Sequence, residues 1–103
     1  MSSIVQINFN NNSSQAQLEQ DSVGAAPMFT DIPGLQWKVW IGNEQGGKAG
    51  GIYLFDNRQN AQAYADSELV QHLRENREDV TVEVFDILEQ PTKLTAKGIP
   101  GIG

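Results

Sequence analysis

Two strand-forming segments that carry most of the large aromatic side chains constrain the fold of this chain more than any other feature. Residues 35–41 alternate between apolar and polar side chains, and residues 49–55 form a second strand-like run. The loop between them, residues 42–48, contains three glycines and favours a hairpin. Both tryptophans and one of the two tyrosines lie in these segments. Since aromatic side chains bury large areas and line ligand pockets, the first candidate site is predicted on these two strands.

The remaining patterns complete the order β-α-β-β-α-β. Residues 4–9 alternate as a strand, and residues 80–85 form a last strand rich in β-branched side chains. Asp56 and Asn57 cap the second helical region. In one interpretation Ser67 caps a further short helix, so that this region consists of two helical segments. This order predicts an α+β, ferredoxin-like fold with a four-stranded antiparallel sheet and both helices on one face.

The first helix is predicted over residues 14–31 as a bent or interrupted one. Pro27 lies opposite the apolar stripe and Gly24 weakens the helix, by about 1 kcal/mol relative to alanine. The stripe itself has spacings of four, three, four and three residues, and consists of Leu18, Ser22, Ala25, Phe29 and Ile32.

The second face of the predicted sheet is not polar throughout, which favours a homodimer. Strand alternation places Trp37 with Leu35 and Val39, the set that we expect to meet the helices, and Trp40 on the other face. An open sheet face with aromatic side chains would leave a large exposed apolar patch. Packing two such sheets face to face in a dimer would cover it.

Charge and composition narrow the function classes. Thirteen acidic and seven basic residues give a net charge of −6, which disfavours nucleic acids and anionic membranes as partners. The absence of cysteine excludes disulfides, thiol nucleophiles and cysteine metal sites. No apolar run approaches the ~20 residues of a membrane span, and no signal peptide is recognisable, so a cytoplasmic location is expected.

The chain is expected to form one domain over residues 1–103. Residues 89–103 contain two prolines and three glycines, which predicts an extended C-terminal arm.

Residues 33–40 and 49–55 closely resemble the YdhR-type putative monooxygenase family, and residues 84–86 resemble its last strand. The resemblance spans roughly residues 4–90. It implies a ferredoxin-like protomer in a dimeric α/β barrel, similar in fold to the antibiotic-biosynthesis and quinol monooxygenases. Those relatives oxygenate electron-rich aromatic substrates without metal, flavin or haem.

The aromatic residues on the two strands admit two interpretations. They can be core or interface anchors, or they can be the walls of a pocket that stacks a flat aromatic substrate. In the second interpretation the Tyr53 phenol orients a substrate oxygen and acts in catalysis. The substrate-binding candidates are then Phe29, Trp37 and Trp40.

Two polar residues complete the set of candidates. His72, the only histidine, is either a solvated helix residue or a pocket acid or base, because imidazole titrates near neutral pH. A single histidine without cysteine does not make a metal site, so none is predicted. The Asn8 amide is satisfied across a dimer interface or by water, or it points into a pocket and binds substrate.

The leading hypothesis is a cofactor-independent monooxygenase that acts on a hydroxylated aromatic or quinol-like molecule. In that chemistry the substrate anion itself gives an electron to oxygen, so that the protein holds the anion, excludes water and relays a proton. No metal or organic cofactor is expected to copurify. The alternative is a non-catalytic dimer of the same fold that binds a small ligand or has only a structural role.

Overall fold

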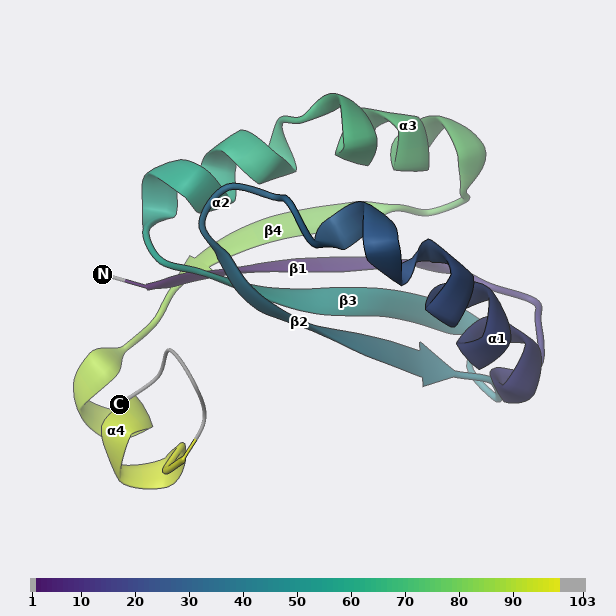
Figure 1. Ribbon diagram of the computed structural model, residues 1–103. Helices are drawn as coiled ribbons and strands as arrows, with labels where there is room; N and C mark the ends of the chain where they lie inside the picture. Colours follow the sequence, from purple (N-terminus) through teal and green to yellow (C-terminus); the bar gives the residue numbers. More distant parts are fainter. Residues whose placement is uncertain (1, 99–103) are drawn as a thin grey trace.

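The computed structural model describes residues 2–98 and has the predicted ferredoxin-like order (Figure 1). The antiparallel sheet has the strand order β2-β3-β1-β4, and α1, α2 and α3 cover one of its faces. The sheet of one chain is open, with β2 and β4 at its edges. No helix within residues 2–98 is long and apolar enough to cross a membrane. The elements are β1 (Ser3–Asn10), α1 (Gln15–Ala25), the 3₁₀ helix η1 (Ala26–Phe29), β2 (Leu35–Asn43), β3 (Lys48–Phe55), α2 (Arg58–Ala65), α3 (Glu68–Asn76), β4 (Thr81–Asp86) and α4 (Glu89–Thr95).

Both predicted helical regions are interrupted at the expected places. Ser14 caps α1 by accepting a hydrogen bond from the backbone N–H of Gln17. The α-helix ends at Ala25 and continues as η1, with Pro27 in its first turn, where the missing N–H is tolerated. Ser67 caps α3 in the same way as Ser14 caps α1, by accepting from the N–H of Val70, and so separates α3 from α2.

The core lies between the sheet and the helices α2 and α3. Phe55 of β3 is fully buried there, and Phe29, from η1, packs against its edge. The buried cluster consists of Val5, Ile7, Tyr53, Phe55, Ala61, Tyr64 and Val70.

A β-bulge in β2 reverses the predicted orientation of the two tryptophans. Leu35 pairs with Phe55, but the next pair joins Trp37 to Leu54, so Gln36 is an extra residue in β2. Lys38 then lies opposite Tyr53 on the helix-covered face. The expectation that Trp37 and Val39 meet the helices is therefore wrong, because the alternation that starts at Leu35 shifts by one residue.

The uncovered sheet face carries apolar and amide side chains. Val39 and Phe85 are exposed there, at 47% and 44% of their surface. Asn8 lies on this face as well, where its side-chain oxygen accepts a hydrogen bond of 3.1 Å from the Gln6 amide. The partner of the Asn8 amide is therefore a neighbour within the same strand.

The C-terminal segment is not extended throughout, in contrast to the prediction. Glu89–Thr95 forms the short helix α4, which lies beyond the end of the sheet (Figure 1). Pro91 does not prevent it, because its position in the first turn is one where the backbone N–H has no partner within the helix. Residues 99–103 of the predicted arm lie outside the described residues.

Candidate functional site

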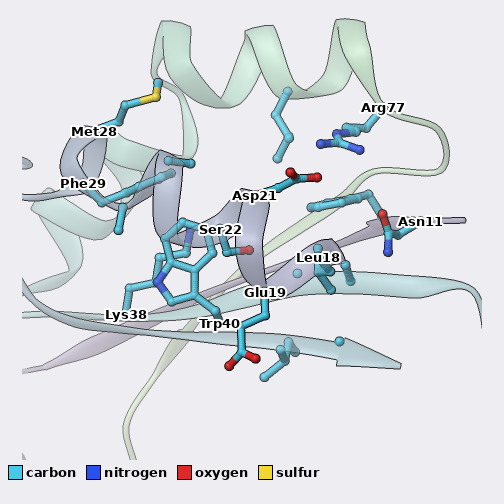
Figure 2. Close-up of a pocket in the computed structure, with 18 of the residues that line it drawn as sticks. Asn11, Leu18, Glu19, Asp21, Ser22, Met28, Phe29, Lys38, Trp40 and Arg77 are labelled. Carbon is cyan, nitrogen blue, oxygen red and sulfur yellow. The ribbon is translucent and has the colours of Figure 1, made fainter. Parts of the chain in front are cut away.

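A cavity of about 510 Å³ lies between the sheet and the layer formed by α1, η1 and α3 (Figure 2). Strands β2 and β3 form its floor, and α1 with η1 forms its roof. The volume falls within the range of about 300–1,000 Å³ that is typical of small-molecule sites.

Three aromatic rings form one end of this pocket. The Phe29 and Trp40 rings meet edge to face, with centroids 5.2 Å apart and planes at 86°. Tyr53 lies beside them, with its ring centroid 6.2 Å from that of Phe29. Phe29 comes from η1 and the other two rings come from β2 and β3, so the bend of the first helical region brings this aromatic end together.

The ammonium group of Lys38 lies among these rings. Its Nζ atom is 3.3 Å from the ring centroid of Trp40, 3.6 Å from that of Phe29 and 4.8 Å from that of Tyr53. Within residues 2–98, no carboxylate lies within ion-pair distance of Nζ. Burial lowers the pKa of Lys38 to about 7, while attraction by the ring faces favours the charged form and opposes that shift.

Tyr53 and Tyr64 form a buried pair behind the lysine. Their ring centroids lie 4.9 Å apart, with the ring planes tilted at 42°. Burial raises the pKa of both phenols, and the adjacent Tyr64 hydroxyl offsets part of that rise for Tyr53. Both hydroxyls therefore keep their protons at neutral pH, and Tyr53 can donate its proton to a ligand oxygen.

The other end of the pocket is polar. Figure 2 shows Arg77 and Asn11 at that end, away from Lys38 and Trp40. The guanidinium carbon of Arg77 lies 5.1 Å from the ring centroid of Phe9. Glu19, Asp21 and His72 also line the cavity.

The structure brings four of the six predicted site residues to this pocket and leaves two outside it. Tyr53, Phe29 and Trp40 line its aromatic end. His72 also lines it, although the side chain is exposed and contacts Asn76.

Trp37 and Asn8 are the two that lie elsewhere. Both belong to the opposite face of the sheet, so a ligand in this pocket would contact neither.

Lys38, the residue with the most unusual environment in the pocket, is not among the residues that the sequence predicts for the site. Lys38 stands between two tryptophans in the sequence, but it is one of only seven basic residues and forms part of no charged run. The one sequence signal that could have indicated this site residue is a single lysine within a strand rich in aromatic residues. Its significance depends on Phe29, a residue from a different element.

A family model described as "Putative mono-oxygenase ydhR" matches residues 4–97. The chain belongs to the YdhR family. Apart from the first residue of β1, the match covers every element from β1 to α4, and it includes all residues that line the pocket. No curated protein matches this YdhR-family chain in sequence.

Solved structures of similar fold include three described as oxygenases or haem degraders. A variant of SnoaB, a cofactor-independent oxygenase from Streptomyces nogalater, is 13% identical with a TM-score of 0.60, and the match covers 84% of this chain and 93% of SnoaB. A putative antibiotic biosynthesis monooxygenase from Deinococcus radiodurans is 15% identical with a TM-score of 0.61, covering 82% and 91%. The haem degrader MhuD from Mycobacterium tuberculosis, with two haems in its active site, is 15% identical with a TM-score of 0.59, covering 82% and 95%. At these identities the likeness extends to the fold of the YdhR-family protein alone.

Proposed function

We propose that this YdhR-family protein is a cofactor-independent monooxygenase that acts on a hydroxylated aromatic or quinol-like small molecule. The observation that carries the proposal is the pocket, where the rings of Phe29, Trp40 and Tyr53 surround the cation of Lys38. Flat aromatic ligands stack on such walls. The family description as a monooxygenase and the cofactor-independent activity attributed to SnoaB support the reaction class.

In this reaction the substrate itself supplies the four electrons that reduce O₂. Overall, the substrate hydroxyl loses its proton, one ring carbon loses one hydrogen and gains one oxygen atom as a carbonyl, and the second oxygen atom of O₂ leaves as water with these two hydrogens. The pocket holds the anion away from bulk water, and the Tyr53 hydroxyl donates a hydrogen bond to its oxygen. We assign the proton relay at the pocket wall to His72.

We also propose that two copies pack through their uncovered sheet faces, at which Val39 and Phe85 are exposed. Sedimentation at micromolar concentration is expected to give twice the chain mass of 11.3 kDa. A stable monomer at that concentration would contradict the sheet-to-sheet dimer. The cytoplasmic location remains a prediction from the sequence.

Oxygen uptake by purified, metal-free protein tests the proposed reaction. A panel of quinols and anthrones is expected to include a substrate that the protein oxidises with consumption of O₂. Tyr53→Phe is expected to reduce turnover roughly tenfold or more, since a hydrogen bond to a charged group is worth about 1.5–3 kcal/mol. Quenching of tryptophan fluorescence by panel members without oxygen uptake would favour the non-catalytic ligand-binding alternative.

A further inference from the structure

We infer that Lys38 is the base that removes the proton from the substrate hydroxyl and then holds the resulting oxyanion, so that the pocket selects ligands with an ionisable hydroxyl. This inference rests on the proposed function and names the substrate class of the same pocket. It assigns the deprotonation to a residue that the sequence patterns did not indicate.

Lys38 lies among aromatic rings without a carboxylate counter-ion from residues 2–98. The Nζ atom of Lys38 lies within 3.3–4.8 Å of three ring centroids, and no carboxylate of residues 2–98 forms an ion pair with it. A partly buried cation without a carboxylate partner is destabilised, and ring faces compensate for only part of that cost. A ligand oxyanion beside Nζ would supply the absent negative charge.

The protonation state of Lys38 suits a base. With its pKa lowered to about 7 by burial, a large fraction of Lys38 is neutral at neutral pH and can accept a proton. Tyr53 from β3 and Tyr64 from α2 keep their protons, because burial raises the pKa of both phenols. Four ionisable side chains of the helical layer also line the pocket. Glu19 and Asp21 come from α1, His72 comes from α3, and Arg77 directly follows α3.

The transfer is a simple acid–base step. The substrate O–H bond breaks, an N–H bond forms at Nζ of Lys38, and the electron pair of the broken bond stays on the substrate oxygen. Nothing is oxidised or reduced in this step. The products are an oxyanion and an ammonium ion in contact, in a site where their attraction is stronger than in water.

Binding of para-nitrophenol tests the inference without any turnover, because its neutral and ionised forms have different absorption spectra. The wild-type protein is expected to bind it as the phenolate, and to bind para-nitroanisole, which has no ionisable hydroxyl, at least tenfold more weakly. Lys38→Met removes the charge and keeps an apolar side chain of similar length. This change is expected to weaken phenolate binding about 10- to 100-fold and to leave the affinity for para-nitroanisole within twofold.

A second substitution distinguishes the role of Lys38 as a base from its role as a counter-ion to the bound oxyanion. Lys38→Arg keeps a cation that does not give up its proton at neutral pH, so it is expected to retain phenolate binding but to lose turnover at least tenfold at pH 7. Lys93→Met, on the surface in α4 and outside the pocket, is the matched control and is expected to match the wild type in both measurements.

Each result decides the inference separately from the proposed function. Phenolate binding by Lys38→Met equal to that of the wild type overturns the inference, even where the wild type consumes oxygen. Full turnover by Lys38→Arg overturns the role of the lysine as a base, and this variant decides the question if Lys38→Met does not fold. A wild type that prefers the phenolate but consumes no oxygen on the whole quinol and anthrone panel overturns the monooxygenase proposal instead.

Discussion

Gly50→Ala is expected to destabilise the domain by about 3 kcal/mol, because a Cβ atom at this position would overlap the backbone carbonyl oxygen of Ile7. Gly50 is a residue of β3, paired with Asn8 on one side and Ile41 on the other. Relief of the overlap requires β1 and β3 to move apart, since no rotation of a side chain removes it. Urea unfolding should show a lower midpoint with an unchanged slope.

Gly24→Ala is the matched control for this substitution. A Cβ atom at Gly24 meets nothing within 4 Å, and the residue lies inside α1. The change is expected to stabilise the protein by about 0.5–1 kcal/mol, since alanine is the better helix former. Equal unfolding midpoints for both variants would show that β3 does not need the close approach to β1.

Trp40→Ala is expected to weaken the binding of a flat aromatic ligand about 30-fold, which corresponds to about 2 kcal/mol. Its ring meets Phe29 edge to face and lies 3.3 Å from the Nζ atom of Lys38, so its removal opens the aromatic end of the pocket. Trp37→Ala, on the opposite face of the sheet, is expected to leave the affinity of each protomer within twofold.

Tryptophan fluorescence gives a direct reading of the same difference, because the chain contains only these two tryptophans. In Trp37→Phe the remaining Trp40 emission should be quenched by the ligand, and in Trp40→Phe the response should be largely lost. Quenching that survives in Trp40→Phe and disappears in Trp37→Phe would place the ligand on the uncovered face.

The order of elements could be read from the sequence because it depends on local signals. The alternation in residues 4–9, Pro27 after a helical stripe and the cap at Ser67 each act within a few residues. The bulge at Gln36 could not be read in this way, since a bulge is a property of two paired strands. The short helix α4 is not apparent from the sequence because prolines and glycines usually interrupt helices, although Pro91 lies in a permitted first-turn position.

The aromatic part of the candidate site is predictable from the sequence, whereas its charged part is not. Phe29, Trp40 and Tyr53 belong to patterns that already indicated pocket or core positions. The chemistry of Lys38 depends on a face set by the bulge and on a ring contributed by η1. Neither condition is expressed in the neighbouring residues, so tertiary structure alone reveals this lysine.

The helices α1 and η1, which form the roof of the pocket, bury less side-chain surface than the rest of the helical layer. Neither α1 nor η1 contains a fully buried side chain, whereas α2 and α3 bury Ala61, Tyr64 and Val70. Segments with little buried apolar surface open locally at a small fraction of the free energy of global unfolding. Exchange of a ligand with solvent therefore needs only a brief separation of α1 and η1 from the sheet, and the hydrogen-bonded strands that hold Lys38 and Tyr53 stay in register throughout.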